Sequence, residues 1–482
     1  MTEHPELAIV TQSPDDPIMV SLVSQFLENE VFFESGENQN LLPSLPADFN
    51  SYKAIAFDEP AFAAARGQLI DYASKDGFLL NMKPPRGVDP RDFNVVLMLD
   101  HLTFAQAHDL ILCAGLQRFH PGLRRVQLAR TDQQLLAELK PRLLKSVSIW
   151  EGWHEFNLYY WKAALRLAEA GHADAREALI TGIRNAAKII PSALTIDYMS
   201  GYFGAVWLCD QTGERGPLER VIANVDEVIV RRPRHMSLLT SCGFADDPLG
   251  LKDKGNSLEA YYDSNWNTAR EIIWTESMLM HGPTFAALAR ATGDQKYREE
   301  IEKLLSHLER CHVRKDGLLW HCTRGDQPGG GAWTRGQSHA LQGLLYVLDE
   351  FQPRDPLYER SVGLIRKVCR ALLPHQDPQT GMWRNVINIP QARLESTGTM
   401  IFTLVCARGI NQGWLDRKEF EPAVRRAWDG IKTRYWRGRV AGSCRGTAGA
   451  VDDAYYLARP QGGSSGSTTA HLLMTLLEIQ RL

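Results

Sequence analysis

The chain has 482 residues, of which 44% are hydrophobic and 23% are charged, and its formal net charge is −3. This composition is typical of a globular protein, and the near-neutral charge argues against nucleic acid or an anionic membrane as a partner. No stretch reaches the ~18 apolar residues of a membrane span, and the amino terminus lacks the basic and apolar segments of a secretory signal. We therefore expect a cytoplasmic protein without a membrane partner.

The eight cysteines are scattered singly, with no Cys-x-x-Cys pair. This spacing argues against a zinc site and favours free thiols that are mostly buried. No GxGxxG or P-loop motif occurs in the amino-terminal part of the chain, so a nucleotide site is unsupported there. We predict neither a metal nor a cofactor.

Residues 1–130 differ in pattern from the rest of the chain. Short apolar runs at 52–60 and 78–85 flank a helix-like stretch at 61–77, and a further strand and helix are predicted at 94–100 and 102–119. This order predicts a small α/β extension over residues 1–130. We interpret it as a structural or oligomerisation element, so a homo-oligomer would form through it.

Residues 131–482 follow a helical pattern almost without interruption. Two predicted helices end alike, at "DQTGE" around Gly213 and "RATGD" around Gly293. Each combines a glycine stop with the start of the next helix, which indicates a helical hairpin. Helix pairs repeated about six times predict a mainly α fold, an (α/α)6 barrel, over residues 131–482.

Aromatic residues collect at the predicted loops of this barrel. Trp153 and His154 lie in "IWEGWHEF", and further tryptophans lie in "GLLWH" and "GAWTRG". Inner helices and their loops would build one funnel at one end of the barrel. The sequence therefore predicts a sugar-sized pocket with aromatic walls.

Two acids stand where apolar helices are expected to begin. Glu276 lies in "REIIWTESMLMHGPTF" beside Trp274, and Asp197 lies in "LTIDYMSGYFGAV". A carboxylate in this position favours the helix dipole or caps the helix, and for each acid alone that is the simpler interpretation. Catalysis is the alternative for both.

The segment "DGLLWHCTRGDQPGGGAWTRGQSHALQGLL", residues 316–345, combines a glycine run with polar and aromatic side chains. Glycines at this density permit close approach of the backbone to a ligand. The segment therefore predicts a binding loop, with Arg335 as a bidentate clamp for a carboxylate or, alternatively, as an ion-pair partner of Asp326. The binding candidates in this loop are His321, Trp333, Arg335, Gln337 and His339.

Together these motifs resemble a known enzyme group. Trp-x-x-x-Met around Glu276, Gly-Leu-x-x-His, Trp-x-Arg-Gly, "GMWRNVINIPQARLESTGTMIF", "CRGTAGAVDDAYY" and "GGSSGSTTAHLLMTLLE" follow one another in the same order. The region from about residue 150 to the end is similar to the unsaturated glucuronyl and rhamnogalacturonyl hydrolases of glycoside hydrolase families 88 and 105.

The resemblance implies an (α/α)6 barrel that hydrolyses a 4,5-unsaturated uronic acid from the non-reducing end of an oligosaccharide. Glu276 falls at the position of the family's acid/base aspartate, and Asp197 falls at its second important aspartate. A tryptophan-lined pocket is expected to raise the pKa of Glu276 and to keep it protonated near neutral pH. The expected substrate-binding residues are Trp274, His321, Trp333, Arg335, Gln337, His339, Trp153 and His154.

The sequence also departs from the family pattern. Glutamate replaces aspartate at position 276, His339 stands where the family usually has tryptophan, and Gln337 stands where it has asparagine. Three other functions therefore stay open. These are an exo-uronidase on saturated sugars that uses Glu276 and Asp197, a sugar epimerase that uses His321 and His339, and a glycan-binding barrel without catalysis.

Overall fold

The computed structural model describes most of the chain after residue 130 and short segments before it. The described residues are 7–10, 41–42, 54–57, 64–65, 67–68, 78–81, 96–98, 131–149, 153, 155–189, 199–231, 234–235, 238–239, 272–324, 326–436, 439–440, 442–444, 453–457, 461–462 and 467–482. They form two compact units. One comprises Met1–Arg130, Lys432–Ser443 and Pro460–Ser464, and the other comprises Thr131–Ile431, Cys444–Arg459 and Ser465–Leu482.

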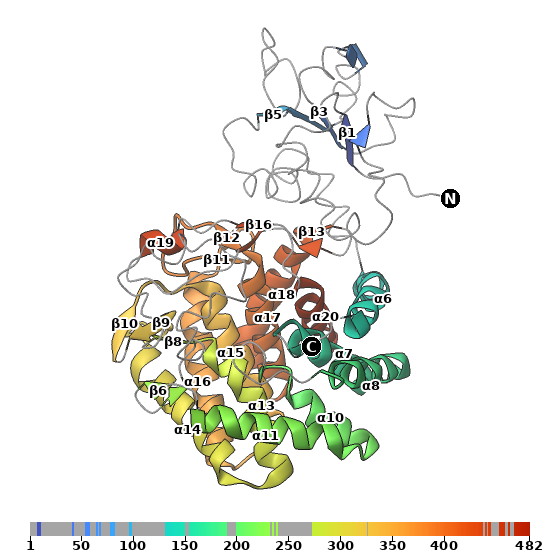
Figure 1. Ribbon diagram of the computed structural model, residues 1–482. Helices are drawn as coiled ribbons and strands as arrows, with labels where there is room; N and C mark the ends of the chain where they lie inside the picture. Colours follow the sequence, from blue (N-terminus) through green and yellow to red (C-terminus); the bar gives the residue numbers. More distant parts are fainter. Residues whose placement is uncertain are drawn as a thin grey trace. The chain divides into compact units, whose positions relative to one another are not determined.

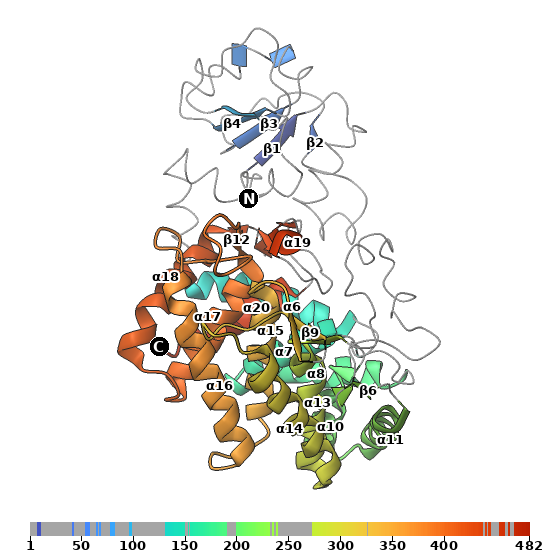
Figure 2. The ribbon, with the colours of Figure 1, turned by 90° about the vertical axis from the view of Figure 1, so that its left-hand side faces the viewer.

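The first unit contains a five-stranded parallel sheet with the order β2-β1-β3-β4-β5 (Figure 2). Its strands are β1 (Leu7–Val10), β2 (Leu41–Leu42), β3 (Ala54–Phe57), β4 (Phe78–Asn81) and β5 (Val96–Met98). Parallel strands need long crossover connections, which agrees with an α/β unit. The strands expected at 52–60, 78–85 and 94–100 are confirmed, whereas β1 and the two-residue β2 were not predicted from the sequence.

The helices expected in this unit are described only in part. Residues 64–65 and 67–68 are helical, within the stretch expected at 61–77. The helix expected at 102–119 lies outside the described residues. The role of residues 1–130 as an oligomerisation element stays a prediction.

The second unit is built from helices (Figure 1). They are α6 (Asp132–Ile149), α7 (Glu155–Glu169), α8 (Ala173–Ala186), α10 (Phe203–Thr212), α11 (Arg215–Arg231), α13 (Ser277–Thr292), α14 (Gln295–His307), α15 (Thr334–Leu348), α16 (Pro356–Leu372), α17 (Ser396–Asn411), α18 (Arg417–Thr433), α19 (Asp453–Leu457) and α20 (Thr468–Ile479). None of the described helices is both long and apolar enough to cross a membrane.

Buried and amphipathic helices alternate along this unit. Helices α13, α15, α17 and α20 are buried on nearly every side, whereas α14 and α16 bury one stripe and expose charged residues on the other. Helices that are apolar all round form the inside of a fold. The neighbours α13–α15, α15–α17, α17–α20 and α20–α7 pack side by side as an inner ring. The predicted (α/α)6 barrel is therefore confirmed.

The two predicted glycine stops are also confirmed. Gly213 ends α10 with φ of 78°, and Gly293 ends α13 with φ of 72°, both in the left-handed region. This conformation favours glycine because a Cβ would be strained there. After the second stop, the Asp294 side chain accepts a hydrogen bond from the amide of Lys296 and caps α14.

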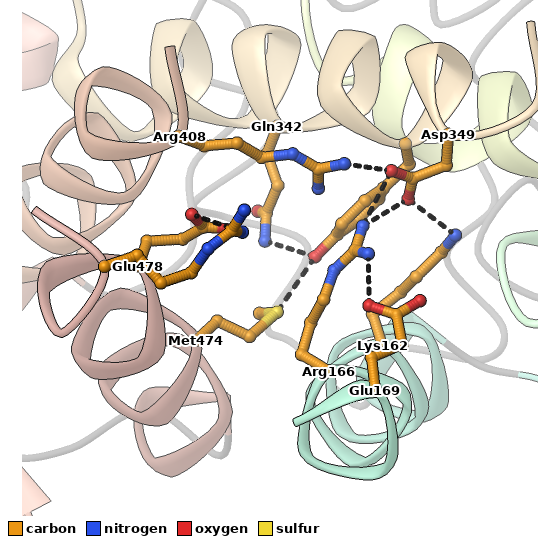
Figure 3. A network of polar contacts seen from close by, with 10 residues as sticks. Lys162, Arg166, Glu169, Gln342, Asp349, Arg408, Met474 and Glu478 are labelled. Atoms are coloured by element: carbon orange, nitrogen blue, oxygen red, sulfur yellow. Dashed lines mark hydrogen bonds and ion pairs between the residues drawn. The ribbon is translucent and has the colours of Figure 1, made fainter. Parts of the chain in front are cut away.

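A buried charge network holds together the ends of the inner helices α7, α15 and α17. Asp349, which directly follows α15, accepts from Lys162 at 3.3 Å, from Arg166 at 2.6 and 2.7 Å, and from Arg408 (Figure 3). Arg166 and Arg408 also stand in the last turns of α7 and α17, whose partial negative charge they complement. A cavity of about 590 Å³ adjoins this network, but its arginines are already matched by carboxylates.

Candidate active site

Strand pairing brings the two central residues of the site together. Strands β8 (Ile272–Trp274), β9 (Cys322–Arg324) and β10 (Gln327–Gly329) form an antiparallel sheet in which Trp274 pairs with Cys322. The ladder continues one step beyond the strands, because the Thr275 amide donates to the His321 carbonyl at 3.0 Å. This register places Glu276 beside His321, although 45 residues separate them in the sequence.

Glu276 lies at the amino-terminal end of α13, as the sequence predicts, with 8% of its surface exposed. Its side chain makes no capping hydrogen bond to the helix. Instead, Oε1 lies 3.1 Å from His321 Nε2, and Oε2 lies 2.9 Å from the Thr275 hydroxyl. The carboxylate therefore makes no capping hydrogen bond, although it stands at the helix start, where the helix dipole favours a negative charge.

The protonation expected for Glu276 is wrong. Burial raises the pKa of this carboxyl, but the charge and the hydrogen bond of His321 outweigh it and lower the pKa to about 2. Conversely, burial lowers the pKa of His321, but the adjacent Glu276 carboxylate raises it to about 10. In the free protein at neutral pH, the pair therefore holds one proton, on the imidazole rather than on the carboxyl.

The rest of the His321 ring is enclosed by aromatic side chains. Its Nδ1 lies 2.7 Å from the Tyr456 hydroxyl. The Trp333 ring meets it edge-on at 4.7 Å, and the Trp274 ring stacks on it at 6.3 Å. Since His321 is 1% exposed, all of these contacts are shielded from water. The ring has little freedom to turn away from Glu276.

Trp333 and Arg335 occupy the start of α15. The Trp333 indole nitrogen donates to Asn385 Oδ1 at 3.1 Å, and only 1% of this residue is exposed. The Arg335 guanidinium lies 5.0 Å from the centre of the Trp333 ring and donates to the Cys444 carbonyl. Among the described residues Arg335 forms no ion pair, so the predicted bracing contact with Asp326 is absent there.

His339 and Gln337 differ in their surroundings. His339 Nε2 lies 3.5 Å from the Tyr159 hydroxyl, and burial lowers the pKa of His339 to about 3, so this imidazole is neutral. Gln337 is fully buried, and its Oε1 accepts from the Leu319 amide at 2.8 Å. Gln337 Oε1 therefore braces the loop, while its buried Nε2 has no hydrogen-bond partner among the described residues, so the expected substrate contact at Gln337 stays a prediction.

Trp153 is likewise a core residue. It is fully buried, its indole nitrogen donates to the carbonyls of Ala186 and Ile189, and its ring packs edge-on against Trp161. This burial corrects the expected substrate contact at Trp153. Asp197 and His154, also predicted as site residues, lie outside the described residues.

A second buried carboxylate, Glu395, lies at the start of α17 but is fully occupied. Its two oxygens accept from the amides of Thr397, Gly398 and Cys444 at 2.6–3.0 Å. A carboxylate that accepts three backbone hydrogen bonds is a helix cap. Glu276, whose oxygens face an imidazole and a hydroxyl, is thus the better candidate for proton transfer.

Sequence reasoning missed three contributors to the site. Thr275 precedes Glu276 directly, Tyr456 lies in "DDAYY", and Asn385 lies in "GMWRN". Asn385 Nδ2 donates to the Tyr456 carbonyl at 2.8 Å, while its Oδ1 accepts from Trp333. The motifs that carry the family resemblance contain Tyr456 and Asn385, which was the available signal. Among the described residues, no cluster of His, Cys, Asp or Glu could hold a metal ion.

Gly336 allows the first turn of α15 to lie against the site. A Cβ at this position would stand 2.6 Å from His321 Cδ2 and 3.1 Å from Thr275 Oγ1. We expect Gly336→Ala to displace the imidazole and to lower kcat about 100-fold, because displacements of about 1 Å at a reacting group have effects of this size. The measurement is steady-state kinetics beside thermal unfolding.

Gly363→Ala is the matched control, since Gly363 lies inside α16 and nothing stands within 4 Å of its added Cβ. This control is expected to retain wild-type kinetics. Equal rates for Gly336→Ala and the wild type would contradict the tight fit at His321.

The sequence and the fold are similar to those of known glycoside hydrolases. Residues 255–482 match the family model for Glycosyl Hydrolase Family 88. A segment of 172 residues is 29% identical to an unsaturated 3S-rhamnoglycuronyl hydrolase of Formosa agariphila, covering 33% of this chain and 45% of that protein. The match thus spans less than half the length of this relative.

Solved structures share the fold at low sequence identity. Possible members of the GH105 family from Salmonella enterica and Klebsiella pneumoniae are each 15% identical, with TM-scores of 0.61 and 0.60. They cover 73% of this chain and 95% and 93% of theirs. An unsaturated glucuronyl hydrolase from a Bacillus species, described as responsible for glycosaminoglycan degradation, has a TM-score of 0.53 at 15% identity. It covers 73% of this chain and 97% of its own.

Proposed function

We propose that this chain is a glycoside hydrolase that releases a 4,5-unsaturated uronic acid from the non-reducing end of an oligosaccharide. The observation that carries the proposal is the buried Glu276–His321 pair, which holds one proton at the amino-terminal ends of α13 and α15. The match to Glycosyl Hydrolase Family 88 supports the same reaction class.

The chemistry follows from the enol ether of such a sugar. The Glu276–His321 pair transfers its proton to C4, and an oxocarbenium ion forms at C5. Water adds to C5 and returns a proton to the pair, which gives a hemiketal. The C5–O5 bond then opens to a ketone, and the resulting hemiacetal at C1 collapses to an aldehyde and releases the next sugar. One residue pair can serve both proton transfers, so this route does not require a second carboxylate.

The charges around Glu276 suit an anionic sugar. The amino-terminal ends of α13 and α15 carry partial positive charge, and Arg335 at the start of α15 has no acidic partner among the described residues. A guanidinium matches a planar carboxylate bidentately, as a lysine does not. We propose that Arg335 recognises the uronate carboxylate and that Trp274 and His339 contact the sugar ring, while the buried Trp333 packs behind the site against His321.

We expect Arg335→Lys to raise the substrate Kd by roughly 10- to 100-fold, the equivalent of about 1–3 kcal/mol for a charge-assisted pair left imperfect. Binding is measured by calorimetry with an inactive Glu276 variant as background. A second titration uses an analogue whose carboxylate is replaced by a neutral amide. The wild type should discriminate strongly between the two ligands and the lysine variant less. Equal discrimination by both would show that Arg335 only braces the loop through Cys444.

The function itself is tested with an unsaturated uronyl disaccharide. Its conjugated double bond absorbs at about 235 nm, and this absorbance disappears as protonation and hydration proceed. The expected result is loss of absorbance with release of the second sugar. Release from only a saturated uronide would instead support a two-carboxylate uronidase. Isomerisation without release would support an epimerase, and binding without turnover would support a glycan-binding barrel.

Two further properties are proposed on the sequence alone. The scattered single cysteines favour a reducing, cytoplasmic location, and residues 1–130 are the proposed oligomerisation element. Cell fractionation and light scattering of the full chain test them separately.

A further inference from the structure

We propose that Tyr456 is a positioning residue that fixes the proton on Nδ1 of His321 and so leaves Nε2 free to exchange a proton with Glu276. This inference rests on the proposed function, because it explains how a pair whose carboxylate is ionised can still deliver a proton. It assigns to the "DDAYY" segment a role in proton transfer.

The geometry around His321 supports this assignment. The Tyr456 hydroxyl lies 2.7 Å from Nδ1, on the opposite side of the imidazole from the 3.1 Å contact between Nε2 and Glu276. Tyr456 is itself fully buried, in a cluster with Trp333, Val386, Ala392 and Cys444. Asn385 holds the backbone of Tyr456 through its carbonyl. The hydroxyl is therefore held in place by packing and hydrogen bonding.

The two protonation states of the pair share one feature. When His321 is an imidazolium, both ring nitrogens donate, Nε2 to Glu276 and Nδ1 to the Tyr456 oxygen. When the Nε2 proton moves to Glu276 Oε1, the neutral imidazole keeps the proton on Nδ1, and its bond to Tyr456 is unchanged. The proton can thus pass along the existing 3.1 Å contact without a change of tautomer or ring orientation.

Other ionisable groups near His321 do not provide this function. His312 and His339 interact with it electrostatically, but burial lowers the pKa of each to about 3, so both are neutral at working pH. The Cys322 sulfur lies 4.0 Å from the Tyr456 hydroxyl. Arg335 keeps a constant charge. The Tyr456 hydroxyl lies 2.7 Å from Nδ1, whereas Cys322, whose hydrogen bond also raises the pKa of His321, offers only a thiol, a weaker partner.

The test is Tyr456→Phe, which keeps the ring and removes the acceptor. The imidazolium then loses a hydrogen bond, so its pKa falls, and the pair loses its proton at lower pH. We expect the alkaline limb of the kcat profile to move down by about one to two pH units, because losing a hydrogen bond to a charged group lowers its pKa by about this amount. At neutral pH kcat should fall about tenfold to 100-fold, by analogy with partners that orient metal-bound histidines, with KM nearly unchanged.

Tyr455→Phe is the matched control, because Tyr455 packs against the Tyr456 ring at 5.3 Å in the same short helix. It should keep the wild-type profile. A lower kcat for Tyr456→Phe with an unmoved alkaline limb would show that Tyr456 only packs, and would overturn the proposal. An inactive wild type on every unsaturated uronide would refute the proposed function instead. Thermal unfolding of each variant confirms that it is folded.

Discussion

Glu276→Gln is expected to lower kcat by about 1,000- to 10,000-fold while substrate still binds. The amide keeps the shape of the side chain but cannot accept the proton of His321 Nε2, 3.1 Å away, or return one to the substrate. It also removes the negative charge that raises the pKa of His321, so the site loses its stored proton at neutral pH. Both proton transfers of the proposed reaction fail together.

The measurement combines single-turnover sugar release with calorimetric binding of an intact oligosaccharide. Asp326→Asn is the control, because Asp326 is an exposed acid in the turn between β9 and β10 and should not affect turnover. If Glu276→Gln keeps more than about a tenth of the wild-type rate, the proton comes from another group. Asp197, at the position of the family's second aspartate, would then be the first alternative.

Asp349→Asn is expected to lower the free energy of unfolding of the barrel unit by about 3–5 kcal/mol. The amide is similar in size, but it leaves Lys162, Arg166 and Arg408 without their shared counter-ion. Lys162 is only 1% exposed and Asp349 12%, so water cannot replace the lost charge. Breaking a buried ion network at one member is costly because the remaining charges stay buried.

The pH dependence of stability provides a second readout for Asp349. The three adjacent cations hold the pKa of Asp349 well below its usual range, even though burial acts to raise it. A lowered folded-state pKa stabilises the fold above the unfolded value of about 3.9, and this contribution is lost as the pH falls below it. Urea unfolding of the wild type between pH 7 and acid should show this loss, and the variant should show a weaker slope.

Glu214→Gln is the control for this prediction, since the Glu214–Arg184 pair is exposed at 38% and 51%. Exposed pairs contribute little to stability because water screens the two charges. If Asp349→Asn were no more destabilising than Glu214→Gln, the network at the end of α15 would contribute little to the fold.

The glutamate side chain at position 276 has a hydrogen-bond partner for each of its two oxygens. Its longer side chain reaches His321 Nε2 with one oxygen and the Thr275 hydroxyl with the other. The resemblance implies a shorter aspartate at this position. We propose that contacts outside the family pattern, with His339 the first of them, select the sugar.

Local signals in the sequence were sufficient to predict the architecture of the barrel. Helical periodicity and the stops at Gly213 and Gly293 depend on nearby residues, and both predicted the hairpins of the barrel. The position of Glu276 at a helix start was equally local, as were the strands at 54–57, 78–81 and 96–98. Periodicity and capping depend on residues a few positions apart, so both can be recognised in a single sequence.

Only the tertiary structure decided the chemistry around Glu276. His321 lies 45 residues from it in sequence, and Tyr456 lies 135 residues from His321, so strand register and packing alone bring the three together. Their contact reversed the expected protonation of Glu276, because a paired imidazole outweighs burial among apolar neighbours. The same long-range packing placed Trp153 and Gln337 in the interior. Their residue types and their positions in predicted loops could not have predicted this burial.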